Sequence, residues 1–202
     1  MVSGIVVASK ANFLEVEIDN PATTPKQLIE FFNQENINNL RLLCTTRKRL
    51  IRQGVFAKVG DRVQLDAIDY NRKTAVITSL EPRITFLNRP PVANVTQIII
   101  ALSLEDPTFT SEQASRFLLT AEQSDVHICI LLTKQDLLDT SLVDNQIRAC
   151  QSWGYQTVAV SAKTGFGIQN LQSIILRQSI SVICGPSGVG KTSLLNYLLP
   201  NL

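Results

Sequence analysis

The sequence has few of the residues from which metal centres and disulfide frameworks are built. It holds four cysteines, one histidine, one methionine and one tryptophan in 202 residues. No two cysteines have the C-x-x-C or related spacing of zinc ligands, so they are expected to be small, reduced, buried side chains of a cytoplasmic protein. His127 begins an apolar stretch without an evident carboxylate or thiol partner, which favours a structural role over a catalytic one.

Long apolar runs are missing as well. No stretch of about 18 apolar residues occurs, so no membrane-spanning helix is expected. The N-terminus lacks the basic region of a signal peptide and is interpreted as a first strand. Hydrophobic residues still make up 45% of the chain and charged residues 18%, which is typical of a folded protein of one or two domains.

Charge is unevenly distributed along the chain. Residues 1–91 hold 13 Lys and Arg against 9 Asp and Glu, whereas residues 92–202 hold 6 against 8. The basic residues are densest between Arg41 and Arg62, where seven of them accompany a single acid, Asp61. A local excess of this kind favours a polyanionic partner.

The first 80 residues have the pattern of a small β domain. About five short strands separated by turn signals, with no long helix, predict a Greek-key barrel of the OB type. A short helix is expected at 25–34, and residues 81–93, which contain three prolines, are interpreted as a linker. The extended or apolar stretches are 4–9, 13–18, 40–44, 54–58, 62–68 and 74–80, with the basic stretch 47–52 among them.

From residue 94 onward, apolar strands alternate with helices. This pattern predicts a parallel sheet that is covered by helices on both faces. The predicted strands are 96–102, 127–132, 156–160 and 179–184, and the predicted helices are 111–124, 141–153, 167–178 and 191–199.

The clearest motif is G-x-x-x-x-G-K-T, which lies between a predicted strand and a predicted helix. Its glycines let backbone N–H groups turn toward phosphate oxygens, and the helix N-terminus adds its positive dipole end. Lys191 is expected to reach the β- and γ-phosphates, and the Thr192 hydroxyl to bind Mg²⁺. The predicted phosphate-binding residues are Gly185, Pro186, Ser187, Gly188, Val189, Gly190, Lys191, Thr192 and Ser193.

Two shorter motifs follow the ends of other predicted strands. In Thr133-Lys134-Gln135-Asp136, the carboxylate of Asp136 could accept the two donors on the edge of guanine, with the Lys134 stem over the ring. Taken alone, the motif fits equally well a polar turn in which Asp136 caps the next helix. Ser161-Ala162-Lys163 is a loop of the kind whose backbone N–H contacts guanine O6. All three motifs fall at the carboxyl ends of strands, where ligands bind in open α/β sheets.

The order of the motifs is permuted relative to ordinary GTPases, which begin with the P-loop. With the base-binding motifs first and the P-loop last, the sequence resembles the small ribosomal subunit biogenesis GTPases, the RsgA or YjeQ family. The segment Ala93–Gln97 is similar to the A-N-V-D-Q start of that family's G domain, with Thr96 in place of Asp. Gly4–Val7 and Val59–Val63 resemble its OB strands, and the resemblance covers nearly the whole chain.

The resemblance implies an α/β protein with an OB-type RNA-binding barrel (1–80), a linker (81–93) and a partial, circularly permuted P-loop GTPase domain (94–202). It also implies GTP, GDP and Mg²⁺ as ligands, and the 30S subunit with its 16S rRNA as partner. The expected protein is a cytoplasmic monomer that acts in late maturation of the small subunit. The basic stretch would contact RNA, although a solvated charged strand is the alternative; its residues are Arg47, Lys48, Arg49, Arg52, Lys58 and Arg62.

The sequence also departs from the family. No D-x-x-G motif occurs, ten residues follow Thr192, the polar insert 19–39 is long, and ligands for the family's C-terminal zinc are missing. Strand 179–184 is therefore expected to be an exposed apolar edge. We expect a truncated chain or fragment, or one completed by a second polypeptide. GTP hydrolysis by this chain alone is expected to be poor, and no catalytic residue is assigned.

Two other functions stay open from the sequence. One is a P-loop ATPase, in which residues 133–136 match by accident and Asp106 is the acidic residue at Mg²⁺. The other is a non-enzymatic RNA-binding module whose incomplete G domain does not turn over. A preference for guanine or adenine nucleotides separates the GTPase from the ATPase, and RNA binding that persists in Lys191→Ala would favour the module.

Overall fold

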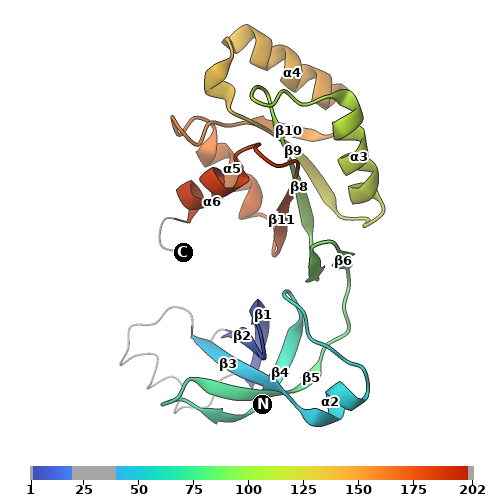
Figure 1. Ribbon diagram of the computed structural model, residues 1–202, viewed down its shortest axis with the longest axis vertical. Helices are drawn as coiled ribbons and strands as arrows, with labels where there is room; N and C mark the ends of the chain where they lie inside the picture. Colours follow the sequence, from blue (N-terminus) through green and yellow to red (C-terminus); the bar gives the residue numbers. More distant parts are fainter. Residues whose placement is uncertain (1, 20–39, 200–202) are drawn as a thin grey trace. The chain divides into compact units, whose positions relative to one another are not determined.

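The computed structural model describes residues 2–19 and 40–199. The chain forms two compact units, Met1–Asn94 and Val95–Leu202 (Figure 1). Among the residues described, no helix is long and apolar enough to cross a membrane. The short helix predicted for residues 25–34 lies outside them.

The first unit is a closed five-stranded barrel with the strand order β1-β2-β3-β5-β4, in which β1 pairs with β4 to close the ring. Alternate side chains of the strands point into the barrel, where Val16, Leu42, Val63 and Ile77 have no exposed surface. The predicted OB-type barrel is thereby confirmed. Its strands are β1 (Val2–Lys10), β2 (Phe13–Ile18), β3 (Arg41–Thr46), β4 (Arg62–Asp69) and β5 (Thr74–Leu80).

The basic stretch after β3 is not a strand, contrary to the alternative considered from the sequence. Lys48–Arg52 forms a one-turn helix, α2, and no strand covers residues 54–58. Leu50 packs against the barrel core and anchors this turn, and the Val55 N–H donates to the Leu50 carbonyl oxygen at 3.0 Å. The cationic side chains around Leu50 are left exposed to solvent.

The segment interpreted as a linker contains a small hairpin, β6 (Phe86–Asn88) and β7 (Pro91–Ala93), and is fastened to the barrel. Arg83 forms a bidentate ion pair with the fully buried carboxylate of Asp61, at 2.7 Å and 2.8 Å. The Asn94 side-chain amide donates to the Gly60 carbonyl oxygen at 2.9 Å. These polar contacts hold the segment against the barrel.

The second unit is built on a sheet with the order β10-β9-β8-β11, in which every neighbouring pair is parallel. Every residue of β8 is buried, as a central strand covered on both faces requires. The predicted parallel sheet is confirmed. Its strands are β8 (Gln97–Ser103), β9 (His127–Thr133), β10 (Gln156–Ala159) and β11 (Ser181–Cys184).

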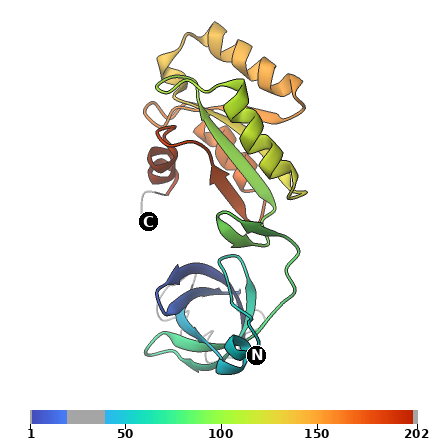
Figure 2. The same cartoon turned by 45° about the vertical axis from the view of Figure 1, so that its right-hand side comes forward.

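Helices cover both faces of this sheet (Figure 2). On one face, α5 and α6 pack on a core that includes Ile99 and Leu131, and α3 and α4 lie on the other. Within the part of the chain described, β11 pairs only with β8, and a groove of about 500 Å³ lined by Ile183 and Leu198 runs beside it. The helices are α3 (Ser111–Glu122), α4 (Thr140–Ser152), α5 (Ile168–Ile175) and α6 (Lys191–Leu198).

The buried ion pair predicts a stability effect that is confined to the barrel. Arg83→Met should lower the free energy of barrel opening by about 2–3 kcal/mol, because the buried Asp61 carboxylate loses its cationic partner. Hydrogen exchange of the β1 and β4 amides measures that free energy. Arg72→Met is the control, since Arg72 and Asp69 form an exposed pair (side chains 84% and 44% exposed), and it should cost less than about 1 kcal/mol. Equal losses in the two variants would contradict a structural role for Arg83.

Candidate nucleotide-binding site

The loop between β11 and α6 is shaped by three glycines with positive φ. Gly185, Gly188 and Gly190 have φ values of +147°, +83° and +87°. A β-carbon at Gly185 would lie 2.1 Å from the carbonyl oxygen of Ala101, so no larger residue fits unless β8 moves. Lys191 opens α6 and folds back over the loop, where its Nζ donates to the Gly185 carbonyl oxygen at 2.9 Å.

The backbone N–H groups of this loop are left available to a ligand. Within the described parts of the chain, none of the N–H groups from Ser187 to Lys191 donates a hydrogen bond to another residue. They cluster at the N-terminus of α6, where the helix dipole places partial positive charge. Together with the Lys191 ammonium, they form a cradle that suits a phosphate group.

Thr133 ties the end of β9 to this loop. It is 4% exposed, and its hydroxyl donates to the Val189 carbonyl oxygen at 2.7 Å, with the Leu102 carbonyl oxygen at 3.3 Å. The Leu104 N–H donates in turn to the Thr133 carbonyl oxygen at 3.1 Å. One buried hydroxyl therefore links the carboxyl ends of β8 and β9 to the loop that follows β11.

Asp136 lies in a short 3-10 turn, Gln135–Leu137 (η2), directly after Lys134. Its carboxylate is half-buried and has no hydrogen bond or ion pair to any residue that the structure describes. Helix α4 begins beyond it, with Asp139 at the N-cap, so Asp136 does not cap that helix. The carboxylate is thus free to accept donors from a ligand.

The third motif is shaped by a buried serine hydroxyl. The Ser161 Oγ accepts the N–H groups of Lys163 at 3.2 Å and Thr164 at 3.1 Å, which closes a tight turn. The Gln135 N–H donates to the Val160 carbonyl oxygen at 3.2 Å and holds this turn beside the end of β9. The Ala162 N–H has no hydrogen-bond partner among the residues described.

A cavity of about 300 Å³ lies where the three motifs meet. Eight of the fifteen residues predicted for the nucleotide site line it: Thr133, Lys134, Asp136, Ala162, Lys163, Val189, Gly190 and Ser193. The other predicted residues are not part of the lining: Ser161, Gly185, Pro186, Ser187, Gly188, Lys191 and Thr192. Four lining residues were not predicted for a guanine site: Asp106, Leu137, Val160 and Leu194. Asp106 follows the carboxyl end of β8, where ligands bind in open α/β sheets, and this position could have added it to the residues predicted for the guanine site.

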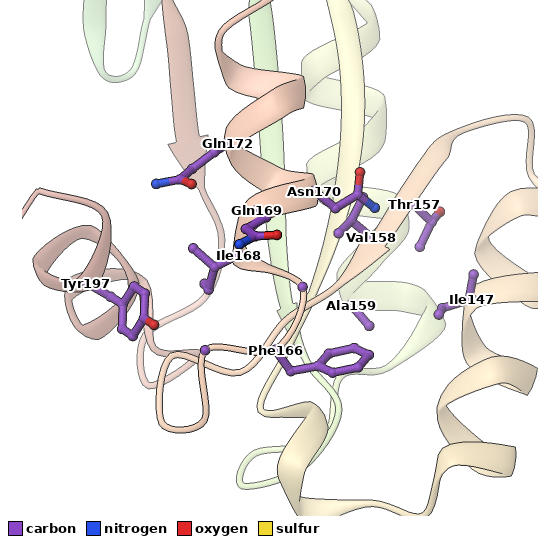
Figure 3. Close-up of a pocket in the computed structure, with 12 residues that line it drawn as sticks. Ile147, Thr157, Val158, Ala159, Phe166, Ile168, Gln169, Asn170, Gln172 and Tyr197 are labelled. Carbon is purple, nitrogen blue, oxygen red and sulfur yellow. The ribbon is translucent and has the colours of Figure 1, made fainter.

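A larger cavity of about 720 Å³ is lined by residues of β10, α5 and the turn 165–167 (Figure 3). Ile147, Phe166 and Tyr197 are among its lining residues, and none of the predicted site residues is.

His127 is remote from the motifs, because it lies at the amino end of β9. One of its ring nitrogens lies 3.2 Å from the Gln97 amide nitrogen.

The cysteines have the character of packing residues. Burial raises the pKa of the Cys44 and Cys129 thiols to about 12 and that of Cys150 to about 11. At Cys184, directly before the loop, burial raises the pKa and the Lys191 charge partly opposes the shift. In the described parts of the chain, no group of three or more His, Cys, Asp or Glu side chains could hold a metal ion.

The basic residues around α2 differ from other cations of the barrel. Arg41 and Arg62 are neutralised by Glu17 and Asp19 at 3.0 Å and 3.1 Å. Arg62 is one of the six residues predicted to contact RNA. The other five form no ion pair with any residue described: Arg47, Lys48, Arg49, Arg52 and Lys58. Positive charge is therefore unbalanced at α2 and the loop after it.

Known proteins share this architecture. The sequence pattern of the RsgA GTPase family matches residues 80–202. The chain is 47% identical over 200 residues to the small ribosomal subunit biogenesis GTPase RsgA of Prochlorococcus marinus strain MIT 9303, and 46% identical over 200 residues to that of Synechococcus sp. strain CC9311. In both cases the match covers 99% of this chain and 62% of the relative, so the chain spans less than two thirds of their length.

Two solved structures are similar to the chain. The crystal structure of YjeQ from Thermotoga maritima has a TM-score of 0.80 and 31% identity, and the match covers 100% of this chain and 66% of that one. YloQ, described as a circularly permuted GTPase, has a TM-score of 0.73 and 26% identity, with 99% and 65% covered.

The Thr133 hydroxyl should be needed for the order of the phosphate-binding loop. Thr133→Val removes a buried donor and leaves the Val189 carbonyl oxygen unpaired, so the α/β unit should lose about 1–2 kcal/mol of stability. Hydrogen exchange should also speed up at the Leu194 amide, which donates to the Gly190 carbonyl oxygen at 3.0 Å, before it does in β8. Thr120→Val removes an exposed hydroxyl that bonds only within α3 and should leave both quantities unchanged. Unaltered exchange of the Leu194 amide in Thr133→Val would show that the tether does not order the loop.

Proposed function

The chain belongs to the RsgA GTPase family, and on that premise we propose that it binds GTP and GDP as part of a GTPase acting in maturation of the small ribosomal subunit. One observation carries the proposal. Residues of three segments that are far apart in sequence, 133–136, 161–163 and 185–193, line one cavity. Within the described chain, the Asp136 carboxylate, the Ala162 N–H and the N–H groups of residues 187–191 have no hydrogen-bond partner in the protein.

In this proposal the phosphates lie on the loop from Gly185 to Ser193. The unpaired N–H groups receive the phosphate oxygens, and Lys191 leaves the loop carbonyl that it now contacts to reach the β- and γ-phosphates. The exposed Thr192 hydroxyl is the protein ligand that we assign to Mg²⁺, whose charge would neutralise the phosphates. Unpaired donors at a helix N-terminus fit this role, because they point toward a bound anion and the helix dipole favours negative charge there.

Guanine is selected at the other end of the cavity. Asp136 accepts hydrogen bonds from N1–H and the exocyclic amino group of guanine, which adenine cannot supply. The Ala162 N–H donates to O6, and the Lys134 stem covers one face of the ring. Ser161 and Lys163 form the turn that presents Ala162. Charged hydrogen bonds contribute about 1.5–3 kcal/mol each, enough to decide between the bases.

The barrel is the proposed RNA-binding part. Its unbalanced charge at Arg47, Lys48, Arg49, Arg52 and Lys58 suits a phosphate backbone, and Arg62 contributes less because Asp19 already neutralises it. The partner that we propose is the 30S subunit through its 16S rRNA, bound by a monomer in the cytoplasm. The curated relatives are named for biogenesis of that subunit, and their additional length extends beyond what this chain matches.

Hydrolysis is a separate matter from binding. No D-x-x-G motif occurs in these 202 residues, and a positioned water and a γ-phosphate sensor are needed for turnover. We therefore propose that this chain alone hydrolyses GTP slowly. The ATPase alternative is not favoured, because the match to the RsgA GTPase family covers residues 80–202 and the Asp106 carboxylate lies 4.0 Å from the Lys134 ammonium.

Nucleotide preference tests the proposal directly. Fluorescent GDP should bind at least about tenfold more tightly than fluorescent ADP in the presence of Mg²⁺, because two charged hydrogen bonds to Asp136 are available only to guanine. Asp136→Asn should remove most of that preference. Asp139→Asn is the matched control, since Asp139 is exposed three residues further on and is not part of the cavity lining. Equal or tighter binding of ADP to the unmodified protein would refute a guanine site.

The charge at α2 should appear in the salt dependence of RNA binding. In Lys48→Gln/Arg52→Gln, the slope of log K against log salt should fall by about 1–2, because two phosphate contacts are lost. Arg41→Gln/Arg72→Gln removes the same charge from cations that are paired with acids and should change the slope much less. Binding to 30S subunits at several salt concentrations measures both. Identical slopes in the two variants would place the RNA contact elsewhere.

A further inference from the structure

A turn that follows β8 forms one wall of the proposed nucleotide cavity. It contains Asp106 and is held in place from both sides. The Leu104 N–H donates to the carbonyl oxygen of Thr133 at 3.1 Å, and beyond Asp106 the Phe109 N–H donates to the Ser103 carbonyl oxygen of β8 at 2.9 Å. The Pro107 ring lies 3.5 Å from the position of a β-carbon on Gly188, so the turn also touches the phosphate-binding loop.

Asp106 is the exposed acid of this turn. It lines the cavity, and its side chain is 93% exposed. Its φ of +45° is in the left-handed region, which few residues other than glycine, asparagine and aspartate adopt. The Lys134 Nζ lies 4.0 Å from the carboxylate, and the carboxylate accepts no hydrogen bond within the residues described. A well-placed acceptor is therefore available at this wall.

The position of Lys134 indicates which part of a nucleotide would meet Asp106. Lys134 starts beside the base-binding Asp136 and extends to the turn, where its ammonium donates to the Asp106 carbonyl oxygen. A nucleotide with its base at Asp136 and its phosphates on the loop 187–191 must place its sugar between these two ends. That sugar would lie along the Lys134 stem, next to Asp106.

We propose that the Asp106 carboxylate accepts hydrogen bonds from the 2′- and 3′-hydroxyls of the ribose, and that it makes the site selective for ribonucleotides over 2′-deoxyribonucleotides. In dinucleotide-binding α/β sheets, a carboxylate accepts a hydrogen bond from a ribose hydroxyl in the same way. Among the residues lining the cavity, the acidic side chains are Asp106 and Asp136, and the second is assigned to the base. The inference rests on the proposed function and names a contact within that site.

An alternative role for Asp106, in which it only balances the charge of Lys134, makes a different prediction. If its carboxylate served only to balance the Lys134 charge, its removal would weaken every guanine nucleotide by the same factor. The loss of a ribose contact, in contrast, weakens GDP more than 2′-deoxy-GDP, because the deoxynucleotide offers the carboxylate only its 3′-hydroxyl. The ratio of the two affinities therefore separates direct contact from an effect through Lys134.

The experiment compares the affinities of GDP and 2′-deoxy-GDP for the unmodified chain, Asp106→Gly and Asp106→Asn. Glycine and asparagine tolerate the positive φ, so both variants should fold, and a thermal melt checks this. The unmodified chain should prefer GDP by about tenfold or more, the contribution of a hydrogen bond to a charged acceptor. Asp106→Gly should reduce the preference to about twofold by weakening GDP. Asp144→Ala, which removes an exposed acid on α4, should keep the full preference.

The outcomes are distinguishable from failure of the proposed function. GDP binding that keeps its full preference over 2′-deoxy-GDP in both Asp106 variants would overturn the ribose contact and leave the guanine site standing. Equal weakening of the two nucleotides would also overturn it, in favour of charge balance at Lys134. If the folded, unmodified chain bound neither nucleotide, the proposed function and this inference would both be wrong.

Discussion

The nucleotide site depends on the parallel pairing of β8 with β9, the next strand along the chain, and with β11, the last strand of the unit. β8 pairs on one side with β9, as at Ser103 and Thr133, and on the other with β11, as at Ile100 and Cys184. Because all these strands run in one direction, their carboxyl ends lie at the same edge of the sheet, and each is followed by one of the turns that form the cavity. A shift of one residue in β11 would turn Val182 away from its buried position.

This constraint explains why a permuted chain can form the site. The cavity requires particular strand ends to be neighbours in the sheet, and it does not require any order along the chain. Thr133 and Val189 are 56 residues apart, yet one buried hydrogen bond of 2.7 Å joins them. The barrel has a comparable buried contact in Asp61 and Arg83. In each unit, a hydrogen bond to or from a fully or nearly buried polar side chain, Thr133 or Asp61, fixes a functional or connecting segment that the apolar core alone would leave free.

Sequence patterns were sufficient where burial leaves a regular signal. The continuous apolar run of β8 and the Gly185–Thr192 motif predicted both the sheet and the position of its loops, because a strand covered on both faces carries few polar residues. They were insufficient for α2, whose five residues are too few to show helical periodicity. They also could not show that the 81–93 segment is bound to the barrel or that Asp106 meets Lys134, since both depend on tertiary contacts between distant residues.

The central claim is that three separated motifs form one guanine-nucleotide site. The most direct test is a titration of the isotope-labelled chain with GDP, followed through the backbone amide resonances. The account predicts that the amides of Ala162 and of residues 187–191 shift together and saturate at the same GDP concentration, while amides of the barrel strands do not move. Shifts confined to residues 187–191, with Ala162 and Asp136 unaffected, would mean that the chain binds phosphate groups alone and would contradict the account.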